Sequence, residues 1–274
     1  MSETNDKRID SNGDLDCSQL YRHTVPLFEF DRRRPILRGS GVVVSVDQKH
    51  FVISAAHVFE SGFSDLGFGY PSPEGFRVFG ARGLKIFVAR AQDGAGNPKR
   101  AVYKDGLDLA IIEPVEEVLE SLQSHYHFFD LRLSSYSPLA KWAVVSGWPA
   151  KKNIYDARKR VCKFQHCYAV QCPFVEIDRL RAAGWNPDTF FGLSANKEKD
   201  FASAISGARV HLPKLDGMSG GGLWVRSSTN SVTPDGDWRL AGIVVEDDEQ
   251  LRMLKAIKVQ QVWTPLFQAW GLSP

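Results

Sequence analysis

The chain has 274 residues, of which 43 % are hydrophobic and 24 % are charged, and its formal net charge is +2. These values are ordinary for a globular protein and exclude a largely disordered or collagen-like chain. The balanced charge gives no electrostatic argument for nucleic acid, and no apolar run approaches the roughly 18 residues of a membrane span. We therefore expect no nucleic-acid and no membrane partner.

The N-terminal segment 1–16 is polar and reads as a mobile tail. A secretory signal would need an apolar stretch of about 7–15 residues after a basic start, and the segment carries none. The sequence therefore predicts a cytoplasmic protein, in which the four cysteines stay reduced.

Most of the chain after the tail reads as short strands rich in Val, Ile and Phe, separated by turn signals such as 47–49 and 234–237. Many strands and few helices favour a sandwich or barrel over a parallel α/β sheet. The predicted strands cover residues 25–30, 41–46, 51–54, 76–79, 84–89, 109–113, 128–133, 143–146, 209–212, 221–226, 239–245 and 255–258.

Helical spacing appears at three places. Apolar residues from Val115 to Leu122 follow an i, i+3, i+4, i+7 pattern, and residues 176–183 form a short helix that stops at Gly184. Residues 259–270 predict a C-terminal helix that ends before a glycine, although Pro265 weakens the case for one unbroken helix. The Gly/Pro-rich stretch 61–75 and the polar stretch 194–206 read as surface loops.

Three local patterns carry chemistry. In ISAAHV, residues 53–58, a strand ends and two small residues precede His57, which leaves room for a substrate beside the ring. In LDLAII, residues 107–112, Asp108 opens an apolar strand, and a buried carboxylate there needs a donor such as a histidine N–H. In GMSGGG, residues 217–222, glycines on both sides of Ser219 permit a tight turn that exposes the hydroxyl.

Together the three patterns supply a nucleophile, a base and a group that orients the base. Serine needs a neighbouring base to act as a nucleophile, and the imidazole of His57 is suited to take its proton near neutral pH. Asp108 would fix the imidazole tautomer. The N–H groups of Gly217 and Ser219 would form an oxyanion hole, and this chemistry requires no cofactor.

The order His57, Asp108, Ser219 within these patterns resembles the trypsin-like (chymotrypsin-fold) serine proteases. The resemblance spans residues 25–270 and implies an all-β fold of two antiparallel six-stranded β-barrels, with the triad between them and a C-terminal helix. It divides the chain into a tail over 1–20, a first barrel over 21–135, a second barrel over 136–258, and the helix and tail over 259–274. It implies a serine endopeptidase that forms an acyl-enzyme with protein or peptide substrates.

Two positions depart from the pattern of the secreted members. Val58 stands where those members carry a cysteine beside the catalytic histidine, which fits an intracellular, disulfide-free relative. Met218 stands where zymogen-activated members carry an aspartate that pairs with a new N-terminus. Methionine cannot form that ion pair, so we predict that cleavage of the tail is not the activation switch.

Substrate preference is harder to predict. Counting back from Ser219, the floor of the specificity pocket corresponds to Pro213, which is not acidic. The strand that would run beside the substrate is followed by four acids, 246–249, which favour a basic residue before the scissile bond; the alternative is a solvated loop. The residues expected to bind substrate are Pro213, Asp216, Val245, Glu246 and Asp247.

The sequence also leaves interpretations other than a protease open. Residues Cys162, His166, Cys167 and Cys172 cluster, but their spacing does not give the paired Cys-x₂₋₄-Cys of zinc sites, so packed thiols and no metal are expected. The basic runs 31–35 and 158–160 read as solvated loops. The functional alternatives are a binding module with a vestigial triad, a latent protease that an activating partner switches on, and an esterase that uses the same triad.

Overall fold

The computed structural model describes residues 17–31, 34–59, 66–73, 75–89, 107–134, 141–149, 154–156, 161–163, 167–194, 201–202, 209–210, 217–226 and 238–274. The polar segment 1–16, the predicted turn at 234–237, and both Pro213 and Asp216 lie outside these residues. Among the described helices, none has the length and apolarity that crossing a bilayer needs.

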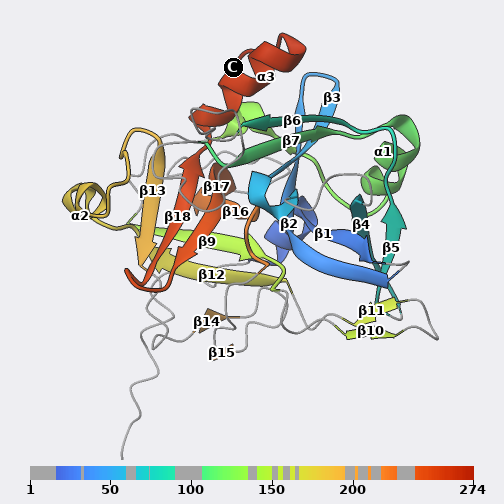
Figure 1. Ribbon diagram of the computed structural model, residues 1–274, viewed down its shortest axis with the longest axis horizontal. Helices are drawn as coiled ribbons and strands as arrows, with labels where there is room; N and C mark the ends of the chain where they lie inside the picture. Colours follow the sequence, from blue (N-terminus) through green and yellow to red (C-terminus); the bar gives the residue numbers. More distant parts are fainter. Residues whose placement is uncertain are drawn as a thin grey trace, which may run out of the picture.

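Two main sheets organise the chain (Figure 1). The described part of the first sheet has ten strands. Their order is β10-β11-β5-β4-β1-β2-β3-β7-β6, and β8 pairs with β2 off this path. Their bounds are β1 Thr24–Asp31, β2 Arg34–Val46, β3 Lys49–Ser54, β4 Leu66–Ser72, β5 Gly75–Gly80, β6 Lys85–Ala89, β7 Leu109–Glu113, β8 Phe129–Asp130, β10 Ile154–Asp156 and β11 Val161–Lys163.

The second sheet has six described strands in the order β12-β9-β16-β17-β18-β13, all paired antiparallel. Their bounds are β9 Trp142–Gly147, β12 Tyr168–Pro173, β13 Phe190–Ser194, β16 Gly222–Arg226, β17 Trp238–Asp248 and β18 Met253–Lys258. The short strands β14 Phe201–Ala202 and β15 Arg209–Val210 pair with each other. The hairpin β10–β11 follows β9 in the chain but joins the first sheet, where Cys162 faces Phe76 of β5.

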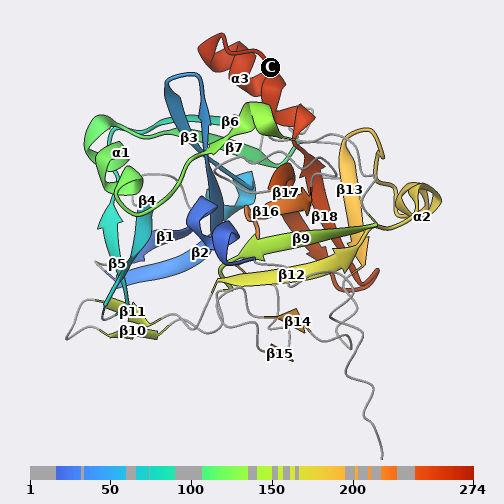
Figure 2. The ribbon, with the colours of Figure 1, turned by 180° about the vertical axis from the view of Figure 1, so that it is seen from behind.

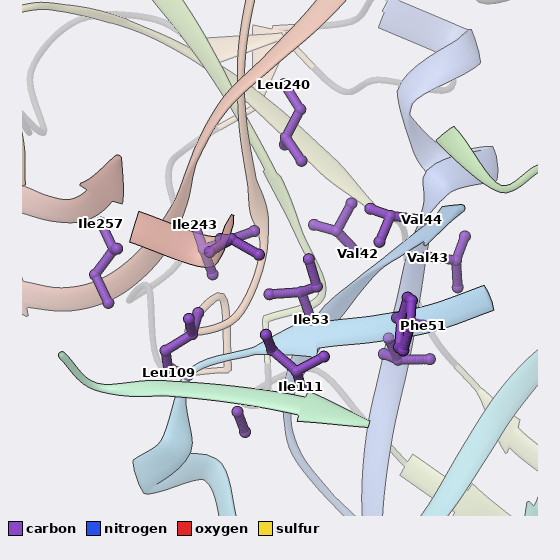
Figure 3. Packing of buried hydrophobic residues seen from close by; sticks show 14 of the residues in the cluster. Val42, Val43, Val44, Phe51, Ile53, Leu109, Ile111, Leu240, Ile243 and Ile257 are labelled. Atoms are coloured by element: carbon purple, nitrogen blue, oxygen red, sulfur yellow. The ribbon is translucent and has the colours of Figure 1, made fainter. Parts of the chain in front are cut away.

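A shared apolar core joins the two sheets (Figure 3). Val42 and Ile53 of the first sheet belong to the same cluster as Leu240, Ile243 and Ile257 of the second sheet, and all five side chains are fully buried. Burying apolar surface is the main stabilising contribution in a globular fold. The strand ends that carry His57, Asp108 and Ser219 are therefore held by one packed core.

The helices fall where the sequence predicts them. They are α1 Glu116–Gln123, α2 Ile177–Ala182 and α3 Gln260–Trp270. The helix α3 runs unbroken through Pro265 and ends at Gly271, whose φ of 69° is left-handed. It follows the second sheet but lies over β6 and β7 of the first sheet (Figure 2), where Trp270 Nε1 donates to Glu113 Oε2 at 2.5 Å.

Two predictions for the first sheet are wrong. Residues 66–72 form β4 and not a loop, because Gly67 and Gly69 serve packing. A Cβ on Gly67 would lie 2.7 Å from the Phe30 ring, and one on Gly69 would lie 2.8 Å from the Phe28 ring. The predicted strand 128–133 is instead the two-residue β8 followed by a 3₁₀ helix, η4, Leu131–Leu133, which the Asp130 carboxylate caps.

Candidate active site

The ends of two paired strands bring His57 and Asp108 together. The strand β3 ends at Ser54, and His57 lies in the 3₁₀ helix that follows, η3, Ala56–Phe59. Asp108 directly precedes β7, which pairs antiparallel with β3 so that Ser54 faces Ala110. In an antiparallel pair, the end of one strand meets the beginning of the other, and the residues just beyond each strand therefore become neighbours.

Asp108 holds His57 through both carboxylate oxygens. The backbone N–H of His57 donates to Oδ1 at 2.9 Å, and the ring Nδ1 lies 2.5 Å from Oδ2. The Asp108 side chain is 4 % exposed, whereas the His57 side chain is 30 % exposed. The carboxylate therefore holds the ring through Nδ1 from the buried side, while part of the His57 side chain stays exposed.

The Ser219 turn belongs to the second sheet and directly precedes β16. Gly217 and Gly220 have φ values of 93° and 86°, which are left-handed conformations that favour glycine. The N–H of Gly221 donates to Met218 O at 2.9 Å, and the N–H of Gly220 donates to Val244 O of β17 at 2.7 Å. Ser219 is half-buried at the tip of this turn.

Strand β2 places the turn beside His57. The N–H of Ser40 donates to Ser219 O at 2.8 Å. A Cβ on the preceding Gly39 would lie 2.9 Å from that same oxygen and 2.6 Å from Val58, the neighbour of His57. Because Gly39 has no side chain, the histidine segment and the serine turn can both pack into the space that a Cβ would occupy.

No hydrogen bond joins Ser219 Oγ to His57 Nε2 in the part of the chain that the structure describes. Val58, the residue after His57, and the Ser219 carbonyl both lie against Gly39, and within the described chain only the His57–Asp108 pair is bonded. Catalytic hydrogen bonds are often long before substrate binds and tighten in the complex.

The backbone of the turn has three N–H groups without an acceptor in the described chain. Of the N–H groups of residues 217 to 221, those of Gly220 and Gly221 have acceptors within the described chain. The N–H groups of Gly217, Met218 and Ser219 have none there. Two of these three, those of Gly217 and Ser219, are the groups that the sequence assigns to an oxyanion hole.

The close packing of the turn gives a stability prediction. A Cβ at Gly220 would lie 2.0 Å from Ser40 O and 2.1 Å from Ser54 Oγ, at a φ of 86°. At Gly271, φ is 69° and no atom lies within 4 Å of the added Cβ. We expect Gly271→Ala to cost about 1–2 kcal/mol of unfolding free energy from backbone strain alone, and Gly220→Ala to cost more than about 4 kcal/mol. Urea denaturation measures both, and equal losses would contradict the packing described for the turn.

Three of the four acids, residues 246–248, are part of a strand. Strand β17 continues through Glu246 and Asp247 to Asp248, because it pairs with β18 as far as Met253. Val245, at an irregularity in this pairing, is buried. The backbone of Val244 forms hydrogen bonds with Gly220 and Gly221 of the Ser219 turn. The next three residues of β17 after this contact are Val245, Glu246 and Asp247.

One charged residue near the site escapes sequence analysis. Lys255 of β18 is buried, with its Nζ 3.7 Å from Glu246 Oε2 and 4.3 Å from the centre of the Phe190 ring. Its ammonium therefore partly neutralises the first acid of the stretch. A lysine between Leu254 and Ala256 in β18 was the available signal.

A small pocket of about 10 Å³ is lined by Val58 and Phe59, which follow His57 in the chain. Its lining is mainly apolar, while Arg38 and Glu29 add a charged pair whose Nε and Oε2 atoms lie 2.6 Å apart. The pocket has room for about one water molecule, so it cannot hold a peptide side chain as it stands.

The buried cysteines lie in separate apolar clusters. Cys167 packs with Phe28, Leu37 and Trp148, and Cys172 belongs to the cluster within the second sheet. The described residues contain no group of three or more His, Cys, Asp or Glu side chains that could share an ion. His166 lies outside the described residues.

Burial also predicts that these thiols are inert. It raises the pKa of Cys167 and that of Cys172 to about 12, because desolvation disfavours the thiolate. The thiolate is the reactive species. We therefore expect both residues to resist a disulfide reagent at pH 8 in the native protein and to react once the chain is unfolded, as peptide mass spectrometry would show. Fast labelling of either thiol in the native state would contradict this burial.

Comparison with known proteins bears on the fold. No family model matches the chain, and no curated protein matches it. Solved structures do match, among them the crystal structure of a scabies mite inactivated protease paralogue, S-I1. The match has a TM-score of 0.52 and 16 % identity, and covers 92 % of this chain and 93 % of that chain. The chain has the chymotrypsin-like fold.

The chymotrypsin-like fold confirms the predicted all-β architecture with a C-terminal helix. At this identity the likeness concerns the fold alone. The division of the chain into four segments stays a prediction.

Proposed function

We propose that the chain is a trypsin-like serine endopeptidase that hydrolyses protein or peptide substrates through an acyl-enzyme. The observation that carries this proposal is the buried Asp108, which binds both the backbone and the ring of His57 beside the Ser219 turn. A carboxylate on Nδ1 keeps the ring proton on that nitrogen and leaves Nε2 able to accept the proton of a nucleophile. The chymotrypsin-like fold supports the proposal at the level of architecture.

In the proposed mechanism, Ser219 Oγ attacks the substrate carbonyl carbon while His57 Nε2 takes the hydroxyl proton. Asp108 keeps the other ring proton on Nδ1 and stabilises the imidazolium. The carbonyl oxygen becomes an oxyanion and accepts from the N–H groups of Gly217 and Ser219. His57 then gives its proton to the leaving amine, which departs. A water molecule, whose proton His57 takes in the same way, attacks the acyl-enzyme carbonyl, and the acid is released as Ser219 regains its proton.

Substrate recognition is proposed to involve the end of β17, which follows the contact of Val244 with the Ser219 turn. The acids after Val245 favour a basic residue before the scissile bond, although Lys255 offsets Glu246. Pro213 and Asp216 remain proposed contributors. A set of fluorogenic peptide substrates with Arg, Phe, Leu or Glu before the leaving group tests this preference. Equal turnover of all four substrates would contradict it.

The test of the proposed function is a digest of a whole proteome by the uncut chain, with Ser219→Ala as control. We expect new peptide termini that are absent from the control digest. Because Met218 cannot pair with a new N-terminus, activity should not require cleavage of the tail. Turnover of esters without any new peptide termini would favour an esterase instead.

A second candidate is a binding module or a latent protease. It is favoured by one of the matching structures, which is described as an inactivated protease paralogue, and by the absence of a His57–Ser219 bond among the described residues. A latent protease would gain turnover when an activating partner is added. A binding module would show no Ser219-dependent turnover under any condition.

The proposed location is the cytoplasm, and the proposed partners are a protein or peptide substrate and an activating protein. The free thiols of Cys167 and Cys172 are compatible with a reducing compartment.

A further inference from the structure

Ser40 lies at the centre of the contacts that hold the Ser219 turn. This residue of β2 is fully buried. Its hydroxyl donates to Gly217 O at 2.9 Å and accepts from the backbone N–H of Trp148 at 2.8 Å. Its own N–H donates to Ser219 O at 2.8 Å, and its carbonyl accepts from Ser54 Oγ at 2.7 Å. One residue therefore binds the turn on both sides of Met218.

The direction of the Ser40 hydroxyl is determined by its neighbours. A serine hydroxyl has a single hydrogen to donate. Because the N–H of Trp148 approaches the oxygen as a donor, the hydroxyl hydrogen is left to point at Gly217 O. Trp148 directly follows β9, so the same hydroxyl links the first sheet, the second sheet and the turn. Trp148 is itself anchored through its indole N–H, which donates to Thr24 O at 2.9 Å.

The two bonds from Ser40 to the turn hold the peptide planes on either side of the Met218–Ser219 plane, which carries the Ser219 N–H. In a planar trans peptide the N–H points opposite to the preceding C=O. The N–H of Gly221 donates to Met218 O. The Ser219 N–H lies in the same peptide plane as this carbonyl and therefore points away from Gly221. Gly217, at a φ of 93°, is a residue about which the adjoining peptide planes rotate with little steric restriction. Its carbonyl is held by Ser40 Oγ, and that bond opposes rotation of the peptide plane that follows Gly217.

We propose that Ser40 is a positioning residue that keeps the Gly217–Ser219 backbone in the conformation that binds the oxyanion. The proposal rests on the proposed function, and it assigns to Ser40 the anchoring that Met218 cannot provide through an ion pair. The side chain of Met218 contributes apolar packing, since it is buried in the cluster of the second sheet. Ser40 does not touch the reacting atoms; it acts through the backbone of the turn.

The test compares Ser40→Ala with Ser146→Ala in the full chain. Ser146 is also a fully buried serine, and its hydroxyl binds Trp224 Nε1 and Thr24 Oγ1, neither of which belongs to the turn. Both variants remove the same atoms from buried hydrogen bonds, so they should lose similar stability. We expect Ser40→Ala to lower kcat about 10- to 100-fold with little change in KM, because a displaced donor weakens transition-state binding. Ser146→Ala should keep kcat within about threefold of the unchanged chain.

A second measurement does not depend on turnover. Amide hydrogen exchange in a peptide that covers residues 217–221 should become faster in Ser40→Ala and stay unchanged in Ser146→Ala. If Ser40→Ala does not fold, Ser40→Cys replaces it, since a thiol keeps the shape and is a weak donor. Unchanged exchange, or equal losses of kcat in the two alanine variants, would overturn the role of Ser40. Failure of the proposed function looks different: the unchanged chain and Ser219→Ala would have equal turnover while the exchange difference persists.

Discussion

Replacing Ser219 with alanine is expected to lower kcat by about a million-fold, the size of loss seen when a catalytic serine is removed. The variant loses the only atom that forms the acyl bond in the proposed mechanism, and water must attack the substrate directly. The fold should persist, because the turn is held by the backbone of residues 217–221 and by Ser40. The measurement is turnover of the best peptide from the cut-site map, together with the thermal unfolding midpoint.

Ser121→Ala provides the control for this loss. Its hydroxyl donates to Glu117 O within the exposed surface of α1, far in sequence from the turn. We expect turnover and unfolding midpoint to match those of the unchanged chain. A Ser219→Ala variant that retains turnover within tenfold would contradict the assignment of the nucleophile.

Replacing Asp108 with asparagine has the second-largest expected effect, a fall in kcat of about 10⁴-fold. The amide oxygen can still accept from the backbone N–H of His57, so the local structure should survive. The amide nitrogen, however, takes the place of the oxygen that faces Nδ1, and it is a donor. The ring must then carry its proton on Nε2, where it cannot accept the proton of Ser219.

Asp178→Asn is the matched control for Asp108→Asn. Asp178 lies in α2 and pairs with Arg181 at 3.2 Å at the exposed surface, so its loss should change kcat less than twofold. If Asp108→Asn lowers kcat less than tenfold while the ring remains bonded to the new amide, Asp108 does not set the tautomer of His57.

The sequence predicts the parts of the fold that depend on local pattern. The strands β3 and β7 and the helix α1 follow from apolar spacing and from their flanking residues. Strand β4 does not, because Gly67 and Gly69 suggest a loop locally and their role is to admit the rings of Phe30 and Phe28. That role depends on the pairing of β4 with β1, which no local pattern contains.

The candidate site divides in the same way. His57, Asp108 and Ser219 each lie in a short pattern of small, apolar or glycine neighbours that sequence analysis can recognise. Ser40 is different, since it is 177 residues from Gly217 in the chain and both partners of its hydroxyl, Gly217 and Trp148, adjoin the other sheet. Lys255 is likewise explained only by the rings and the carboxylate that surround it in space.

The most direct test of the central claim is the location of a covalent fluorophosphonate adduct in the intact, uncut chain. Peptide mass spectrometry after labelling should place one phosphonyl group on Ser219, and the Ser219→Ala variant should remain unlabelled. Labelling should also fall strongly in Asp108→Asn, because His57 no longer accepts the serine proton. An adduct on another residue, or equal labelling of Ser219→Ala and the unchanged chain, would contradict the assignment of His57, Asp108 and Ser219 as a working triad.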